Sequence, residues 1–184
     1  MGKNLVQQKR GKGGPRYRVP SFRYLGKISY AALPNTEGQI IDIVHSPGHK
    51  IPAAVADFSG KRVLMIPAEG VYVGQKIGNN LENGHTTILR DIPEGTRIFN
   101  VELNPGDGGR LCRSSGAFAT VISKDERKTI VLMPSKQKKV LSADCRATIG
   151  IVASSGRTDK PFMKAGTKHY SMKALGHLYP IVSG

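Results

Sequence analysis

The stretch Ile98–Gly116 reads Ile-Phe-Asn-Val-Glu-Leu-Asn-Pro-Gly-Asp-Gly-Gly-Arg-Leu-Cys-Arg-Ser-Ser-Gly. Its first half is typical of a strand, because Ile98, Val101 and Leu103 are apolar and β-branched or aromatic residues dominate. The strand breaks at residues 104–109, where three glycines in four residues allow positive φ and are expected to leave backbone N–H groups uncovered. Uncovered N–H groups of this kind can form a nest for a phosphate.

Basic and hydroxylated side chains follow the glycines at once. Arg110 and Arg113 supply fixed positive charge, and Ser114 and Ser115 add hydroxyl donors beside the loop. A strand that leads into a glycine turn edged with arginines suits docking on a polyanion. The alternative is a tight structural turn with incidental arginines, and this stretch by itself does not separate the two.

Two nucleotide-binding interpretations of the loop fail on spacing. A phosphate-binding loop of the Walker type needs Gly, four residues and then Gly-Lys-Ser/Thr, and that pattern is absent from the sequence. A dinucleotide fingerprint would need glycine at position 111, where the chain has Leu111. The loop therefore favours a polyanion over a free nucleotide cofactor.

Charge is unevenly distributed along the 184 residues. The chain carries 28 Lys+Arg against 13 Asp+Glu, a formal net charge of +15, which points to nucleic acid or another anionic surface. Residues 1–30 hold eight basic side chains and no acidic one, residues 109–184 hold fourteen basic and four acidic, and the middle is slightly acidic. A charge that served only solubility would be scattered, so this segregation favours a binding role.

The remaining composition excludes several other classes. Cys112 and Cys145 are the two cysteines, and without a Cys-x-x-Cys motif they do not form a secreted disulfide framework. No apolar stretch approaches the roughly 18 residues of a membrane span, and the basic N-terminus lacks the apolar run of a signal peptide. We expect a cytoplasmic protein with no membrane partner.

Short strand-like runs recur from Phe22 onward at a spacing of about 8–12 residues, which is typical of small barrels. The first set covers residues 22–30, 38–45, 53–58, 61–66, 71–77 and 86–92. Ser59-Gly60, between two of these runs, is a two-residue hairpin signal. Five or six strands suit a small closed barrel.

A second set of runs covers residues 96–103, 117–123, 129–133, 139–141 and 147–153. A short piece around Ala143–Arg146 is the only one expected to be helical. Residues 1–21 have too little apolar content to bury themselves, and from Ser154 the strand pattern dissolves into a basic segment. The sequence thus predicts an all-β fold with two barrels, 22–92 and 93–154, between a basic arm at 1–21 and an extended basic segment at 155–184.

No group of side chains assembles a catalytic or metal site. His45 and His49 have the spacing of a helical zinc site, but Ser46-Pro47-Gly48 between them indicates a turn. The Ser-Ser-Gly sequences at 114–116 and 154–156 lack the Gly-x-Ser-x-Gly pattern of hydrolases. We therefore expect no metal, no cofactor, no small-molecule substrate and no enzymatic activity.

Several of these runs resemble the large-subunit ribosomal protein L-two family. They are Asp91–Thr96, Asn100–Leu111, Arg113–Gly116 and Cys145–Gly150. The N-terminal Arg10-Gly11, Tyr17-Arg18, Pro20-Ser21 and Arg23, with the later Gly156–Pro161, are similar to its archaeal and eukaryotic cytoplasmic branch. The match follows the order of essentially the whole chain.

The resemblance implies an oligonucleotide-binding (OB-fold-like) barrel followed by an SH3-like barrel. It also implies binding to large-subunit ribosomal RNA near the peptidyl-transferase region and the subunit interface, beside other ribosomal proteins. The family supports assembly and subunit association, while the RNA performs peptidyl transfer. The family continues past the position of Gly184 into a Gly/His-rich extension, and Cys112 stands where a small residue such as Ala is usual.

The sequence therefore predicts a two-barrel ribosomal protein that binds ribosomal RNA on the ribosome. One alternative is a transient RNA-binding translation factor built from the same barrels, and another is an enzyme that acts on nucleic acid. The candidate RNA-binding residues carry positive charge or belong to the glycine loop and its edge: Lys9, Arg10, Lys12, Arg16, Arg18, Arg23, Gly108, Gly109, Arg110, Arg113, Ser115, Arg157, Lys160, Lys164, Lys168 and Lys173.

Overall fold

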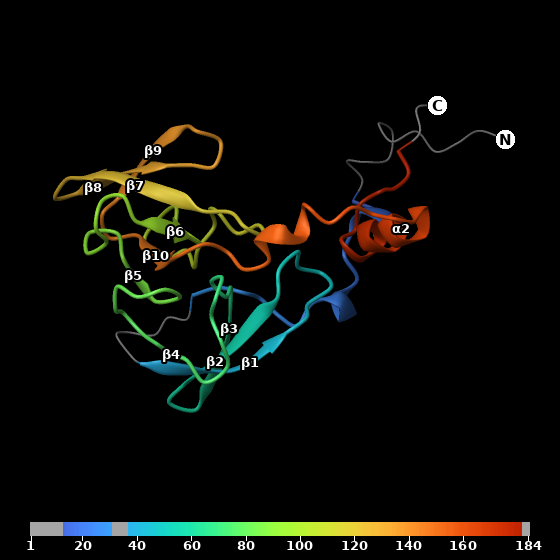
Figure 1. The fold of residues 1–184 in the computed structure, drawn as a ribbon, viewed down its shortest axis with the longest axis horizontal. Helices are drawn as coiled ribbons and strands as arrows, with labels where there is room; N and C mark the ends of the chain where they lie inside the picture. The colour runs from blue at the N-terminus through green and yellow to red at the C-terminus, as the bar shows by residue number, and fades with distance from the viewer. Residues whose placement is uncertain (1–12, 31–36, 182–184) are drawn as a thin grey trace. The chain divides into compact units, whose positions relative to one another are not determined.

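The computed structural model describes residues 13–30 and 37–181, and the chain forms two compact units (Figure 1). The larger one, called the sheet unit here, contains Lys27–His45 and Ile51–Arg157. The smaller one, the terminal unit, contains Met1–Gly26, Ser46–Lys50 and Thr158–Gly184. Lys9, Arg10 and Lys12 lie outside the described residues.

The sheet unit begins with a four-stranded antiparallel sheet in the order β3-β2-β1-β4. Its strands are β1 (Gly38–Val44), β2 (Ala53–Phe58), β3 (Lys61–Met65) and β4 (Lys76–Ile77). Ser59 and Gly60 connect β2 to β3 with φ values of 52° and 87°, as a hairpin turn that matches the twist of its strands requires. The hairpin predicted at these two residues is confirmed.

A six-stranded antiparallel sheet follows, in the order β5-β10-β6-β7-β8-β9. Its strands are β5 (Thr86–Ile88), β6 (Arg97–Phe99), β7 (Ala119–Lys124), β8 (Lys128–Leu132), β9 (Lys138–Ser142) and β10 (Arg146–Ile149). The chain returns through β10 into the middle of the sheet, between β5 and β6. This return places residues from either side of the glycine-rich stretch next to each other.

Apolar side chains on one face of these strands form the core. Along β8, buried Thr129 and Val131 alternate with more accessible residues, which is the period of a strand with one buried face. A second cluster joins the two sheets through Phe99 of β6 and Ala53 of β2. The main cluster consists of Leu89, Ile92, Ile98, Val101, Ala119, Val121, Val131, Leu141, Cys145, Ala147 and Ile149.

The all-β prediction, with two successive sets of antiparallel strands, is confirmed, but three assignments within it were wrong. Thr86–Ile88, assigned to the first set, pairs with β10 in the six-stranded sheet. Residues 143–146 form no helix: Ala143 and Asp144 form a turn, and β10 begins at Arg146. Residues 22–30 contain no strand and begin with the 3-10 turn η3 (Ser21–Arg23). The domain boundary placed between residues 92 and 93 stays a prediction.

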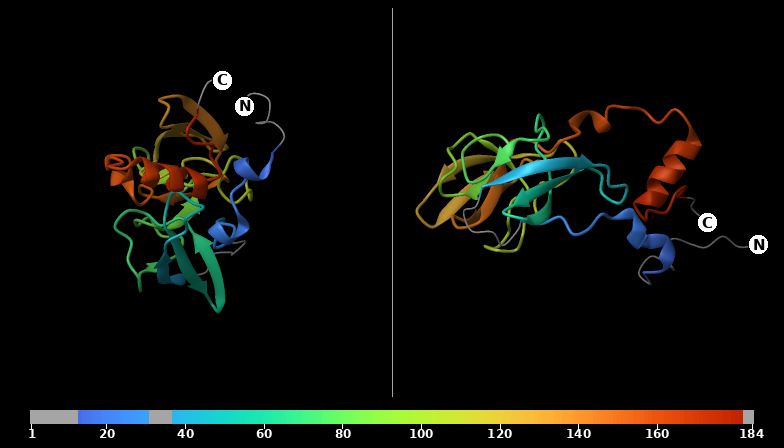
Figure 2. Two further views of the ribbon diagram at one scale, coloured as in Figure 1. Left: turned by 90° about the vertical axis from the view of Figure 1, so that its right-hand side faces the viewer. Right: turned by 90° about the horizontal axis from the view of Figure 1, so that it is seen from below.

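The terminal unit contains the 3-10 turns η2 (Pro15–Tyr17) and η3, and the ten-residue helix α2 (Ala165–Ala174). The expectation of an extended segment after residue 155 missed both α2 and the turn η4 (Ser155–Arg157), which ends the sheet unit. α2 buries none of its residues, so its sequence has no apolar periodicity to reveal it. Figures 1 and 2 show the N-terminal turns, in blue, beside α2, in red.

No helix within residues 13–30 and 37–181 has both the length and the apolar character that crossing a bilayer requires.

Candidate nucleic-acid interface

The glycine-rich stretch forms a closed loop on the sheet unit. Val101 and Leu111 make an isolated antiparallel bridge, with hydrogen bonds of 3.0 Å from Val101 N to Leu111 O and 2.9 Å from Leu111 N to Val101 O. Residues 102–110 are thereby enclosed between two paired positions directly after β6. The sheet thus fixes where the loop starts and ends.

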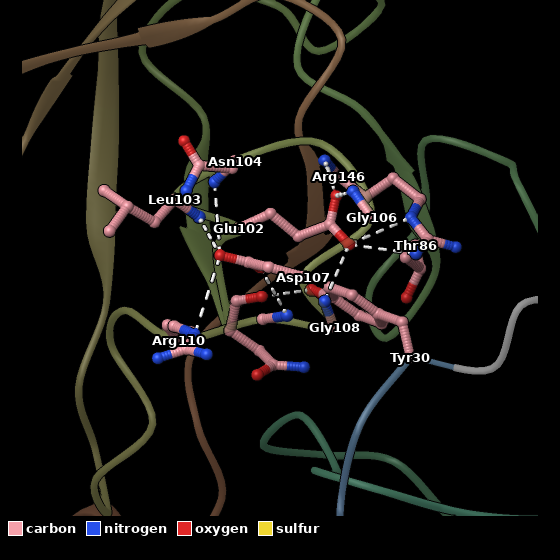
Figure 3. Close-up of polar contacts among 12 residues, drawn as sticks. Tyr30, Thr86, Glu102, Leu103, Asn104, Gly106, Asp107, Gly108, Arg110 and Arg146 are labelled. Carbon is pink, nitrogen blue, oxygen red and sulfur yellow. Dashed lines mark hydrogen bonds and ion pairs between the residues drawn. The ribbon is translucent and has the colours of Figure 1, made fainter.

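A buried carboxylate organises the inside of this loop. The side chain of Glu102 is fully buried and accepts the backbone N–H groups of Gly106 (3.2 Å) and Gly108 (3.1 Å) (Figure 3). It also accepts the backbone N–H of Arg146 (2.9 Å) and its guanidinium Nη2 (2.9 Å). Arg146 is the first residue of β10, so the loop is connected to a central strand of the sheet.

Burial and hydrogen bonding act in opposite directions on the acidity of Glu102. Desolvation is the largest single influence and tends to raise its pKa, but the hydrogen bonds from Arg146, Gly106 and Gly108 together outweigh it. The pKa of Glu102 is therefore lowered from the ordinary value of 4.5, and the carboxylate is ionised at neutral pH.

Asp107 holds the outer part of the loop. Its Oδ2 accepts the N–H groups of Leu103 (3.0 Å) and Asn104 (3.1 Å), and its Oδ1 accepts that of Gly109 (3.2 Å). Desolvation tends to raise the pKa of Asp107, but these three hydrogen bonds and the nearby charge of Arg110 lower it. Arg110 Nε lies 3.8 Å from Asp107 Oδ2 (Figure 3).

The expectation that the loop leaves its N–H groups uncovered was wrong. The N–H groups of Gly106, Gly108 and Gly109 all donate to carboxylates of the chain itself. The loop does form an anion-binding nest, but Glu102 and Asp107 are the anions that fill it. This arrangement was not predicted from the sequence; the signal that could have indicated it was the presence of two acidic residues, Glu102 and Asp107, beside the glycines.

The two adjacent glycines have a structural role in this arrangement. Gly108 and Gly109 are buried and have φ values of 85° each, a region that favours glycine. A Cβ on Gly109 would lie 2.6 Å from Asn100 O, and one on Gly108 would lie 3.1 Å from Ser29 Cβ. Direct contact of these glycines with RNA stays a prediction, now without the free N–H groups that suggested it.

The two arginines of the loop have different surroundings. The guanidinium of Arg113 donates to Ile28 O (2.7 Å) and Gly109 O (3.0 Å), and desolvation lowers its pKa. Arg113 therefore fastens the segment that precedes Tyr30 onto the loop. The side chain of Arg110 is 69% exposed, so its charge faces solvent despite the ion pair with Asp107.

Tyr30 completes the polar network behind the loop, and it was not identified as a site residue from the sequence. Its hydroxyl donates to Asn100 O and shares a hydrogen bond of 3.0 Å with Thr148 Oγ1 in β10. Its backbone N–H donates to Gly108 O (3.2 Å), and the Arg146 guanidinium lies 5.3 Å from its ring centroid. Burial raises the pKa of the Tyr30 hydroxyl, so the hydroxyl stays protonated.

Ser115 and Arg157, 42 residues apart in the chain, are two predicted residues that the fold brings into direct contact. Arg157 Nε donates to Ser115 Oγ over 2.9 Å, and Arg157 remains exposed in η4. The terminal unit presents Arg18, Lys160, Lys164 and Lys173 as exposed residues, with Lys168 half-buried. Arg16 belongs to η2, and Arg23 lies with its guanidinium 5.5 Å from the Phe22 ring centroid.

One of the two histidines with the spacing of a zinc site, His49, lies in the terminal unit and contacts side chains there. His49 Nδ1 shares a hydrogen bond of 2.7 Å with Ser46 Oγ, and its ring packs edge-on against Tyr24 at 4.7 Å. Among the residues that the structure describes, no three His, Cys, Asp or Glu side chains gather as metal ligands would.

Comparison with known proteins decides the family. The family model described as "Ribosomal Proteins L2, C-terminal domain" matches residues 82–184. The whole chain is 43% identical to the "Large ribosomal subunit protein uL2" of Methanococcus maripaludis and covers 81% of that protein. The chain belongs to the uL2 family of ribosomal proteins. Proteins of the same name from Methanosphaera stadtmanae and Methanothermobacter thermautotrophicus are 42% and 40% identical, again with the whole chain covered and 81% of the relative.

Membership in the uL2 family confirms the predicted resemblance, and the relatives named here fit its archaeal branch. It identifies the chain as a structural ribosomal protein of the large subunit. The region matched by the family model includes the whole glycine loop, β10, η4 and α2. Glu102 and its hydrogen-bond partners Gly106, Gly108 and Arg146 therefore lie inside the part of the chain that carries the family match.

Proposed function

We propose that this uL2-family chain binds large-subunit ribosomal RNA near the peptidyl-transferase region and the subunit interface, where it supports assembly and subunit association. The chain contributes shape and positive charge, and it has no part in bond making or breaking. Contacts of this kind position a protein on RNA through phosphates more than through base identity.

The distribution of charge between the two units carries this proposal. Among the residues that the structure describes, the terminal unit holds eight Lys+Arg residues and one Asp+Glu residue. The two basic ends that the sequence places far apart therefore belong to one compact unit. A small body with this density of positive charge attracts a polyanion strongly and in a salt-dependent way.

The sheet unit supports a more local contact. Arg110 and Arg157 are exposed, and the guanidinium Nε of each has a partner in the chain. Arg110 pairs with Asp107, and Arg157 donates a hydrogen bond to Ser115. Because these partners already restrict the side chains of the two arginines, a contact with phosphate would cost less side-chain conformational entropy. We therefore infer that these two arginines are the phosphate-binding residues of the loop region.

A salt titration of RNA binding tests the proposal. The full chain would be bound to large-subunit ribosomal RNA over a series of salt concentrations, beside the double variant Lys160→Gln/Lys164→Gln. Each lost phosphate contact should flatten the slope of log affinity against log salt by roughly 0.7–0.9. The matched control neutralises two exposed lysines of the sheet unit, Lys61→Gln/Lys128→Gln, and should change the slope less.

Equal slopes for the parent chain and both double variants would contradict a binding role for the terminal unit. A crosslinking map of the chain on ribosomal RNA would test the location near the peptidyl-transferase region. Retention on isolated large subunits through a high-salt wash separates a resident ribosomal protein from a transient translation factor.

A further inference from the structure

The N-terminal segment and the end of α2 are in direct contact within the terminal unit. Gly176, two residues after α2, is buried and has a φ of 66°. A Cβ at this position would lie 2.8 Å from both Arg18 C and Val19 N. Glycine at 176 thus allows the backbone of the C-terminal segment to pack against the backbone of the N-terminal arm.

A cavity of about 660 Å³ lies at this contact. Arg18 and Pro20 line it from the N-terminal side, His169 and Lys173 from α2, and His177 and Tyr179 from the segment that follows. This volume is within the range of roughly 300–1,000 Å³ that small-molecule sites occupy in proteins. The cavity is therefore large enough for more than a single small ion.

The lining combines positive charge with flat apolar surface. Arg18 and Lys173 are basic, and none of the described residues that line the cavity is acidic. Tyr179 and prolines supply the apolar part, and Lys168 Nζ lies over the Tyr179 ring at 5.2 Å from its centroid. Lys168 thus lies over one face of this ring. Such a lining is complementary to a nucleotide, because the phosphate pairs with the cations and the base stacks on the aromatic ring.

We propose that this cavity receives one unstacked nucleotide of the ribosomal RNA, with the base against Tyr179 and the phosphate at Arg18 and Lys173. This inference rests on the proposed function and adds to it a site for a splayed nucleotide, where the sequence suggested only a diffuse basic surface. A lone phosphate would need no apolar wall, and an acidic peptide would need no aromatic ring on which to stack a base.

Titration of the full chain with adenosine 5′-monophosphate, followed by backbone amide NMR shifts, tests the site. Inorganic phosphate and a hexaglutamate peptide serve as the competing probes. We expect the nucleotide to shift the amides of Arg18, Lys173 and Tyr179, and to bind at least tenfold more tightly than either competing probe. Phosphate or hexaglutamate binding as tightly as the nucleotide would overturn the proposal, as would an absence of nucleotide binding.

Two variants with matched controls locate the binding. Tyr179→Leu should weaken nucleotide binding about 5- to 150-fold, the loss expected for one stacked base, whereas Tyr170→Leu, on exposed α2 surface outside the cavity, should not. Lys173→Gln should weaken it and Lys164→Gln should not, so the test holds even if Tyr179→Leu alters the local fold. Nucleotide binding that is unchanged in Lys173→Gln would overturn the site. If ribosomal RNA binding keeps its salt slope while the nucleotide fails to bind, only this inference falls and the proposed function stands.

Discussion

The carboxylate of Glu102 lies 2.9 Å from the guanidinium of Arg146, and the two ends of this ion pair differ in burial. The Glu102 side chain is completely buried, whereas 26% of the Arg146 side chain remains exposed. The charge of Glu102 is therefore stabilised only by its partners in the fold, whereas the charge of Arg146 is also in contact with water. In a chain with a net charge of +15, a buried acid holds this glycine-rich loop in place.

Glu102→Gln should lower the free energy of unfolding by about 3 kcal/mol, the lower end of the range for breaking a buried pair, because Arg146 keeps access to water. The amide cannot accept all the hydrogen bonds that the carboxylate accepts from Gly106, Gly108 and Arg146. Denaturant unfolding measures the change. The control Glu126→Gln, in the exposed turn between β7 and β8, should be within about 0.5 kcal/mol of the parent.

Stability should fall when the pH is lowered below about 5. The pKa values of Glu102 and Asp107 in the folded chain lie below their ordinary values of 4.5 and 3.8. The stabilisation from these carboxylates is thus complete above the unfolded pKa and is lost as pH falls through the folded pKa. Denaturant melts between pH 7 and pH 3 would show the loss. If the Glu102→Gln variant and the parent chain lost stability at low pH to the same extent, Glu102 would not be a source of that loss.

Gly109→Ala should destabilise the chain far more than Gly106→Ala, although both glycines have positive φ, of 85° and 83°. A methyl group on Gly109 would lie 2.6 Å from Asn100 O, whereas one on Gly106 would have no atom within 4 Å. We expect about 1 kcal/mol for Gly106→Ala from backbone strain alone and several kcal/mol for Gly109→Ala. Thermal melts of the two variants side by side measure the difference. Equal melting temperatures would show that the close approach to Asn100 is not a constraint.

Arg110→Gln and Arg113→Gln should separate RNA binding from folding. Arg113 donates to Ile28 O and Gly109 O, so its loss should cost about 1.5–3 kcal/mol of stability, as for hydrogen bonds from charged groups. Arg110 is mostly exposed, so its loss should leave stability nearly unchanged and weaken RNA binding instead. Paired melts and filter-binding assays at one salt concentration read out both effects. An Arg110→Gln variant that binds RNA as tightly as the parent would remove this loop from the binding surface.

Both cysteine thiols should react slowly with iodoacetamide in the folded chain. Burial raises the pKa of Cys112 to about 11, and desolvation also raises the pKa of the fully buried Cys145. The reactive thiolate is therefore scarce at pH 8. Mass spectrometry of timed samples should show fast labelling only after denaturant is added. Rapid labelling of Cys112 under native conditions would contradict its burial.

Local sequence patterns determined the hairpin of β2 and β3. The short, mostly apolar runs at residues 53–58 and 61–65, with Ser59-Gly60 between them, predict a hairpin, since both the runs and the turn depend on neighbouring residues only. The charge segregation likewise followed from the sequence, as did the resemblance to the family that the comparisons confirm. α2 was missed because a helix that buries nothing carries no apolar period.

The assignment of partners required the tertiary structure. Thr86–Ile88 pairs with β10 and not with the strands just before it in the chain. The hydrogen bonds between two strands do not depend on how far apart the strands are in the sequence, so local patterns could not predict this partner. Glu102 and Arg146, 44 residues apart, meet only because β10 inserts between β5 and β6. The sequence by itself determined that a glycine turn with arginines lies at residues 104–113, with the conformational freedom to form a nest. The tertiary structure decided that two carboxylates of the chain itself, the buried Glu102 and the partly exposed Asp107, fill that nest, because a hydrogen-bonded partner within the fold is held in place at all times and a phosphate from solution is not.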